Sequence, residues 1–253
     1  MKVIDLYKYL DAHIPSSLSC EWDNDGLMCC PDENAEVNRV LVTLDVTTDA
    51  IIKAEEIGAD IILSHHPLIF KGVKAINSDS VVPSRVIGLI KSNIAVMSFH
   101  TRLDAVEGGV NDTLALTLGI ENAEPFGDGG IGRIGELDAP TSLDEFASLV
   151  KDRLNAPTVT YAGNGRDVRR VAVLGGSGSN DIAAAVAAGA DTYVSGTLSY
   201  HEMADAPDGP INLIEAGHFH TEDPVCDTLS ELVWSADDSI ETVYYNSYRT
   251  KNI

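Results

Sequence analysis

The chain has 253 residues, of which 44% are hydrophobic and 22% charged, and its formal net charge is −22 at pH 7. A chain of this length and composition folds as one large or two ordinary domains. The negative charge repels phosphate backbones, so direct nucleic-acid binding is not expected, and no apolar run approaches the ~20 residues that cross a bilayer. The same charge concentrates cations, although an acidic surface kept for solubility or a salty cytoplasm explains it equally simply.

Hydrophobic spacing predicts helices and strands in alternation along the chain. In the first half we expect a helix at 4–14, strands around 27–29 and at 39–44, a helix capped by Thr48 or Asp49 and running to 58, a strand at 60–64, a helix at 82–92, a strand at 94–99 and a helix at 110–118. In the second half we expect a helix at 142–154, strands at 158–161 and 171–174, a helix at 182–188, strands at 192–195 and 212–215, a helix at 223–234 and an edge strand at 241–245.

This order of elements predicts an α/β fold with two βα-type domains and mainly parallel sheets. The glycine-dense segment 127–132 is the best candidate for a boundary, which gives domains at 1–126 and 127–253. An open alternative is that the C-terminal segment, from about residue 217, packs back on the first domain.

Five of the seven histidines fall in three short segments, each directly after an expected strand. These segments are Ser-His-His-Pro at 64–67, His-Thr-Arg-Leu-Asp at 100–104 and Gly-His-Phe-His-Thr-Glu at 217–222. Ligands of α/β sheets collect outside the carboxyl ends of the strands. Imidazole combined with carboxylate is the ligand set of Zn, Fe, Mn, Co or Ni. The three segments therefore predict one metal centre assembled from distant parts of the chain.

Carboxylates complete this expected centre. Asp104 lies four residues after His100, and a carboxylate can bridge two cations where an imidazole cannot. Glu222 lies four residues after His218, so the two side chains share a face if a helical turn begins near residue 219. The simpler interpretation of Glu222 is an acidic residue placed near a helix N-terminus.

Adjacent residues of a regular strand face opposite sides, so His65 and His66 converge only because Pro67 ends the strand. The predicted metal ligands are His65, His66, Asp104, His218 and Glu222. Five ligands exceed one tetrahedral structural zinc site and do not saturate two ions, which leaves positions for water as in catalytic sites. We therefore expect two divalent transition-metal ions, of unspecified identity among Zn, Fe, Mn, Co and Ni.

These motifs resemble the Nif3-like dinuclear metal centre proteins, which are also known as homologues of type 2 GTP cyclohydrolase I. The resemblance spans nearly the whole chain, through motifs at 22–27, 64–68, 100–104, 175–179, 195–201 and 217–222. It implies two α/β domains, a pair of metal ions between them, the same five ligands and a toroidal homohexamer. The chain departs from the family pattern at Thr197, where an acidic residue is common, and at Asp25, where a small apolar residue is usual.

Other segments allow two interpretations each. The glycines of 175–179 either cradle an anion with their N–H groups or form a plain strand-to-helix turn. His201 and Glu202 are either a helix-surface pair or groups that face a substrate. Trp22 and Asp23 either close a cleft, or Trp22 belongs to the core.

A metal-dependent hydrolase of phosphoester, nucleotide or cyclohydrolase-type amide substrates is the leading functional interpretation, with His100 or His201 as the catalytic proton shuttle. The alternative is a non-catalytic metal-binding or regulatory assembly protein. The expected partners are further copies of the chain, as a hexamer, and a small phosphorylated or nucleotide substrate, with no membrane contact. The N-terminus shows no signal peptide, so a cytoplasmic location is expected.

Overall fold

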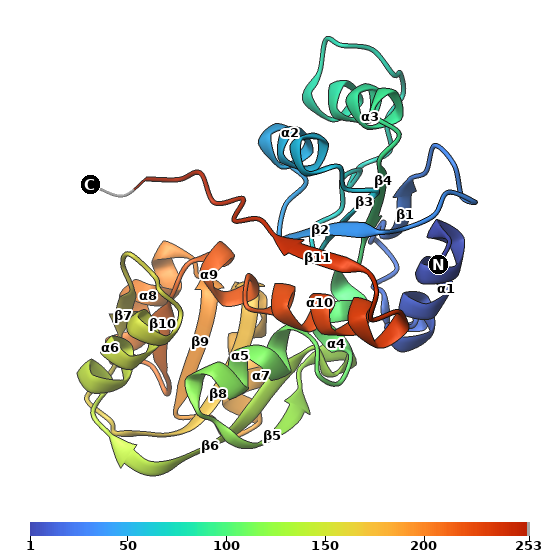
Figure 1. The fold of residues 1–253 in the computed structure, drawn as a ribbon. Coiled ribbons are helices and arrows are strands. Elements are labelled where there is room, and N and C mark those ends of the chain that lie inside the picture. Colours follow the sequence, from blue (N-terminus) through green and yellow to red (C-terminus); the bar gives the residue numbers. More distant parts are fainter. Residues whose placement is uncertain (252–253) are drawn as a thin grey trace. The chain divides into compact units, whose positions relative to one another are not determined.

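In the computed structural model, residues 1–251 are described and divide into two compact units. The first unit comprises Met1–Leu103 and Cys226–Arg249, and the second comprises Asp104–Val225 with Thr250 and Lys251. Each unit has a sheet of its own, so the α/β class with two sheets is confirmed (Figure 1). The predicted limits of the two domains, 1–126 and 127–253, stay a prediction.

The sheet of the first unit has five strands in the order β1-β4-β3-β2-β11. Their bounds are Gly26–Cys29 (β1), Arg39–Thr43 (β2), Ile61–Ser64 (β3), Ala95–Ser98 (β4) and Glu241–Tyr244 (β11). Strands β4, β3, β2 and β11 run parallel, and β1 is antiparallel to β4. The strand predicted near the C-terminus is confirmed as an edge strand, paired with β2. Because β3 and β4 are parallel and in register from Ile61↔Ala95 to Ser64↔Ser98, their carboxyl ends lie side by side.

The predicted helices of the first unit are present as α1 (Val3–His13), α2 (Thr48–Ile57), α3 (Val81–Lys91) and α10 (Val225–Ala236). A 3-10 turn follows α1 at Ser16–Leu18, and the short helix α4 (Thr101–Ala105) follows β4. The predicted cap of α2 is wrong by one position, because the Thr47 side chain accepts the N–H of Ala50 at 3.1 Å. Gly58, at φ 64°, ends this helix in the left-handed region that favours glycine.

Helices α2 and α3 cover one face of this sheet (Figure 1). Their apolar side chains, among them Ala50, Ala54 and Leu89, pack on Leu41 and Ile62 of the strands. The alternate strand residues point to the opposite face and are equally buried. Strands buried on both faces read as continuous apolar runs, which is why the sequence located β2, β3 and β4 correctly.

The sheet of the second unit has six strands in the order β5-β6-β8-β9-β10-β7. Their bounds are Glu121–Phe126 (β5), Gly132–Thr141 (β6), Thr160–Ala162 (β7), Val168–Ser177 (β8), Thr192–Thr197 (β9) and Asn212–Glu215 (β10). Strands β8, β9 and β10 are parallel, whereas β5, β6 and β7 join by antiparallel pairing. Strands β5 and β6 were not predicted, because neither contains an apolar run. Strand β5 is exposed except at Phe126, and the buried start of β6 reads Gly-Arg-Ile-Gly. The glycine-dense segment 127–131, with the 3-10 turn Asp128–Gly130, connects these two strands.

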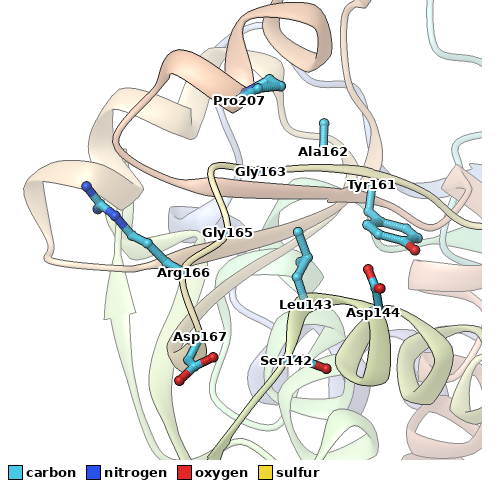
Figure 2. Close-up of a pocket in the computed structure, with 10 residues that line it drawn as sticks. All are labelled: Ser142, Leu143, Asp144, Tyr161, Ala162, Gly163, Gly165, Arg166, Asp167 and Pro207. Atoms are coloured by element: carbon cyan, nitrogen blue, oxygen red, sulfur yellow. The ribbon is translucent and has the colours of Figure 1, made fainter.

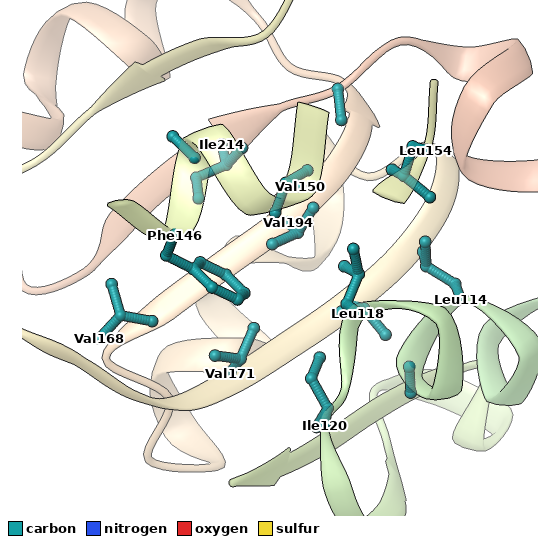
Figure 3. Packing of buried hydrophobic residues seen from close by; sticks show 14 of the residues in the cluster. Leu114, Leu118, Ile120, Phe146, Val150, Leu154, Val168, Val171, Val194 and Ile214 are labelled. Atoms are coloured by element: carbon teal, nitrogen blue, oxygen red, sulfur yellow. The ribbon is translucent and has the colours of Figure 1, made fainter. Parts of the chain in front are cut away.

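Two layers of helices enclose the second sheet. They are α5 (Val110–Leu118), α6 (Leu143–Arg153), α7 (Ile182–Ala187), α8 (Tyr200–Asp205) and α9 (His218–Glu222), with 3-10 turns at Ser179–Asp181 and Ala206–Asp208. Figure 3 shows Leu114 and Leu118 of α5 and Phe146 of α6 packed against Val171 and Val194. The alternate residues of β8 pack against α7 on the other face. Burying a side chain of this size contributes roughly 1.5–3 kcal/mol before the cost of ordering it.

The predicted N-terminus of α6 is confirmed in detail. Ser142 accepts the N–H of Glu145 at 3.3 Å, and Glu145 accepts the Ser142 N–H at 3.2 Å, so the two residues form a capping box. Across residues 1–251, no helix combines the length and the apolar character that crossing a membrane requires.

Candidate metal centre

Two neighbouring histidines stand at the carboxyl end of β3. The strand ends at Ser64, whose hydroxyl donates to the His66 carbonyl at 2.9 Å and lies 2.9 Å from the Ser98 hydroxyl. His65 is fully buried, and the centroids of the His65 and His66 rings are 5.0 Å apart. The predicted convergence of adjacent histidines just beyond a strand end is therefore confirmed.

His100 brings a third imidazole to the same place from the end of the adjacent strand β4. Its ring centroid lies 5.2 Å from that of His65 and 5.7 Å from that of His66. One ring nitrogen from each of the three histidines lies within 4.8 Å of the others, so this cluster could hold a metal ion. We call these three residues the imidazole cluster.

Each ring of the imidazole cluster is oriented through its Nδ1 atom. Nδ1 of His65 lies 2.9 Å from the carbonyl oxygen of Phe99, and Nδ1 of His66 lies 2.7 Å from Oδ1 of Asp45. Nδ1 of His100 lies 2.9 Å from Oδ1 of Asp23. An oxygen acceptor at Nδ1 favours the tautomer with the proton there and makes Nε2 the basic nitrogen. Metal-ligating histidines are held in this way in proteins, so the cluster fits a divalent transition metal.

Asp23 is a carboxylate that several hydrogen bonds hold in place. Its Oδ2 atom accepts the N–H of Thr101 at 3.0 Å and the Thr101 hydroxyl at 2.6 Å, while Oδ1 faces His100. Burial alone would raise the pKa of Asp23, but the hydrogen bonds from His100 and Thr101 outweigh it and lower the pKa far below its usual value. Asp23 is therefore ionised at any physiological pH. The structure shows Asp23 as a hydrogen-bond acceptor for His100, and the closure of a cleft by Trp22 and Asp23 stays a prediction.

A buried guanidinium holds the next turn of the chain in place. Arg102 is 1% exposed, donates from Nε to Asp25 at 3.0 Å and from Nη1 to Asp11 at 2.6 Å, and lies 4.5 Å above the Phe99 ring. Burial disfavours the charged form, but the bonds to Asp11 and the charge of Asp25 outweigh it and raise the pKa of Arg102. Asp25 also accepts the His100 N–H at 3.2 Å. Asp25 thus supports the segment that carries His100.

The second unit carries a histidine–carboxylate pair on α9. Nε2 of His218 lies 3.2 Å from Oε2 of Glu222, which confirms that residues four apart share a face here. Glu222 is buried, whereas the His218 side chain is 44% exposed. Helix α9 begins directly after Gly217, whose φ of 88° favours glycine.

Two N–H groups of the glycine motif at 175–179 are taken up by hydrogen bonds within the second unit. The Gly175 N–H donates to the Asn111 side chain at 2.8 Å, and the Gly176 N–H donates to the Thr221 hydroxyl at 3.1 Å. A Cβ atom at Gly176 would lie 2.2 Å from Oε1 of Glu222. The glycines therefore allow α9 to pack closely on the sheet, and the anion-binding interpretation is wrong for these N–H groups.

Asp104 and His201 complete the set of predicted site residues. Asp104 is buried on α4, and its carbonyl oxygen lies 3.3 Å from Nδ2 of Asn111. His201 is exposed on α8, where its ring centroid lies 5.5 Å from that of Tyr200. Its neighbour Glu202 closes a capping box at the start of α8. Glu202 thus has a structural role, as the helix-surface interpretation requires.

A separate pocket of about 540 Å³ lies in the second unit, between the start of α6 and the segment that follows β7 (Figure 2). Asp144 and Tyr161 face each other at one side of it, and their hydrogen bond raises the pKa of Tyr161. Arg166 lines the other side, but its Nη1 atom donates to the Pro210 carbonyl at 2.6 Å. No motif in the sequence indicates this pocket, because its lining combines the start of α6, the end of β7 with the segment after it, and the 3-10 turn at Ala206–Asp208.

The chain is thus an α/β protein whose oriented imidazoles, at the ends of adjacent strands, could hold a metal ion. The chain belongs to the Duf34/NIF3 (NGG1p interacting factor 3) family, whose model matches residues 1–251. It is 35% identical over 246 residues to a GTP cyclohydrolase 1 type 2 homolog of Clostridium perfringens, covering 94% of both chains. A Methanocaldococcus jannaschii protein of the same description is 32% identical over 224 residues, covering 88% of this chain and 90% of the relative.

Solved structures agree with this assignment. The Staphylococcus aureus protein SA1388 superposes with a TM-score of 0.90 at 29% identity, covering 100% of this chain and 99% of the other. The family resemblance is thereby confirmed. The set of five ligands, the number and identity of the ions, the hexamer, the substrate and the cytoplasmic location stay predictions.

Proposed function

We propose that the protein binds two divalent transition-metal ions and is a metal-dependent hydrolase of phosphoester, nucleotide or cyclic amide substrates. The observation that supports this proposal best is the common orientation of three imidazoles. Each directs Nδ1 to an oxygen, at 2.9, 2.7 and 2.9 Å, and therefore offers a basic Nε2. A single histidine with such a bond is common in a protein core, whereas three histidines oriented in the same way at one edge of a sheet indicate a site.

The proposed ligands are those expected from the sequence: His65, His66, Asp104, His218 and Glu222. Two imidazoles just after β3 and one on α9 would supply nitrogen donors, and two buried carboxylates would offset the charge of the ions. When bound, such ions supply Lewis-acid polarisation and bring the pKa of water close to neutrality. The family supports the proposal, since its curated members are described as GTP cyclohydrolase 1 type 2 homologs.

His100 is the proposed proton carrier. Its Nδ1–H is held by the ionised Asp23, so Nε2 takes up a proton while the carboxylate stabilises the resulting imidazolium. Tying Asp23 to Thr101 as well prevents the pair from separating when the charge changes. His201 remains an alternative carrier, although it is exposed and far less constrained.

The decisive experiment separates metal binding from turnover. Protein loaded with Mn, Zn or Fe and freed of excess metal is screened against phosphate esters, nucleotides and cyclic amides. We expect His100→Gln to keep its metal, measured by elemental analysis, while turnover falls by roughly 10²–10⁴-fold as expected for a lost acid–base group. Glu222→Gln should lose both metal and turnover. Full metal content without turnover on any substrate class would support the non-catalytic alternative instead.

A further inference from the structure

Trp22 is an exposed indole on a loop that is otherwise firmly held. Its side chain is 64% exposed, so the interpretation of Trp22 as a core residue is wrong. Two residues before it, the Cys20 N–H donates to the Thr101 hydroxyl at 2.9 Å, and two residues after it the Asn24 side chain donates to the Ile69 carbonyl. The backbone around Trp22 is thus fixed on both sides, while its ring faces solvent.

Phe70 lies beside this indole, on the segment that follows His65 and His66. It is 44% exposed, and the Asn24–Ile69 hydrogen bond joins its segment to the Trp22 loop. The ring centroids of Trp22 and Phe70 are 6.0 Å apart with planes at 75°. His100 completes the group, at 6.3 Å from Trp22 and 5.9 Å from Phe70. The two exposed rings are therefore continuous with the imidazole cluster.

We propose that Trp22 and Phe70 bind a planar aromatic ring of the ligand that reaches His100. This inference rests on the proposed function, because it describes the substrate of the same site. Aromatic rings attract one another in offset-stacked and edge-to-face arrangements, and two rings at 75° offer a face and an edge to a third. Held loops lower the entropy lost on binding, so an exposed indole on such a loop is a preorganised contact.

Charge extends the assignment to the rest of the ligand. Lys71 and Lys74 lie on the Phe70 segment and are exposed. In a chain with a net charge of −22, two exposed lysines one and four residues after Phe70 provide positive charge that can attract an anionic group. The ligand class is therefore a planar aromatic ring that carries a phosphate or similar anion.

Tryptophan fluorescence tests the inference directly, since the chain has two tryptophans. The second, Trp234, is 49% exposed on α10, and Trp234→Phe leaves Trp22 as the sole reporter. This variant, in metal-loaded and metal-free form, is titrated with adenosine monophosphate, adenosine and ribose 5-phosphate. We expect adenosine monophosphate and adenosine, which carry an aromatic base, to quench Trp22, and ribose 5-phosphate, which has none, to leave the emission unchanged.

Variants then assign the contact to these side chains. By calorimetry on the metal-loaded protein, Trp22→Leu should bind adenosine monophosphate roughly tenfold more weakly than Trp234→Phe, because stacking on one aromatic ring is lost. Trp22→Phe should recover part of that loss, and Phe70→Leu should weaken binding in the same direction. Replacing Lys71 and Lys74 by glutamine should weaken the nucleotide and leave adenosine unchanged. Equal effects on both probes would overturn the anionic part of the assignment.

Two results would overturn the inference as a whole. One is that Trp22→Leu binds the nucleotide as tightly as Trp234→Phe does, or that neither adenosine monophosphate nor adenosine quenches Trp22. The other is an indole that acrylamide cannot reach in the ligand-free protein, which would show that a second copy of the chain covers Trp22. Failure of the proposed function looks different: quenching persists while metal content or turnover is absent.

Discussion

Nδ1 of His100 and Oδ1 of Asp23 lie 2.9 Å apart although 77 residues separate them in the chain. The contact joins the loop before β1 to the segment after β4, two strands that pair antiparallel. Parallel pairing of β3 and β4 brings the imidazoles to one edge, whereas the loop that enters the antiparallel edge strand β1 supplies the carboxylate that orients the third ring. The site therefore depends on both kinds of strand pairing.

Close packing of α9 gives a first prediction. A Cβ atom at Gly196 would lie 2.6 Å from the Gly176 carbonyl and 2.7 Å from the Cα atom of His218, with backbone on both sides. Gly196→Ala should lower the free energy of unfolding by about 1–3 kcal/mol, the usual cost of overpacking, and should reduce metal content by displacing α9. Urea unfolding and elemental analysis measure the two effects.

Gly88 is the matched control for this substitution. It lies inside α3, and apart from the backbone of that helix no atom lies within 4 Å of the position that a Cβ atom would take. Gly88→Ala should therefore stabilise the protein by about 0.5–1 kcal/mol, because alanine loses less backbone entropy in a helix. Equal destabilisation by both alanines would contradict the packing argument.

The sequence was sufficient to locate the imidazole cluster because its signals are local. Buried parallel strands appear as short apolar runs, and the residues after them must lie at one sheet edge, which placed His65, His66 and His100 together. The i,i+4 spacing of His218 and Glu222 is likewise a local property.

The supporting contacts could not be predicted, because they depend on tertiary pairing. Nothing near Asp45 or Asp23 in the sequence indicates a histidine 21 or 77 residues away. Arg102 is the largest fully buried side chain among residues 1–251, against the general preference of arginine for the surface. Its burial follows from two carboxylates on other segments. Trp22 is the opposite case: a large aromatic side chain is expected in the core, but in the structure it is exposed.

Asp181 provides a prediction on pH. Burial, and then the nearby charge of Asp128, raise the pKa of Asp181 above its usual value. The folded state thus binds a proton more tightly than the unfolded state, so stability falls as pH rises from about 4, the unfolded value, through the raised pKa. Asp181→Asn should be more stable than the wild type at pH 7, and the difference should vanish below about pH 4. Thermal unfolding at pH 3.5 and 7 checks this, and a constant difference would refute it.

Metal content tests the role proposed for Asp104. Reconstituted wild-type protein should contain more than one equivalent of metal per chain. Asp104→Ala should lose both ions if the carboxylate bridges them, whereas His65→Ala should keep part of the load, because an imidazole binds one ion. Elemental analysis after desalting measures both. Asp138→Ala, which removes an exposed carboxylate from β6, should retain the full content. Equal partial losses in the first two variants would count against bridging.

Assembly should depend on salt. The family resemblance predicts a closed ring of six chains, and closed symmetry avoids open filaments. Copies that each carry a net charge of −22 repel one another, so apolar contacts must hold the ring together. Screening lengths fall from about 10 Å at 0.1 M salt to about 3 Å at 1 M, so the ring should tighten as salt is added. The mass measured by light scattering across this range should approach six times the monomer mass of 27.0 kDa, with dissociation first at low salt.

Sucrose at matched viscosity is the control for assembly, because it leaves the repulsion between chains unscreened. A monomer at every salt concentration would exclude the ring, and a dimer would discard the sixfold analogy while leaving the metal proposal intact.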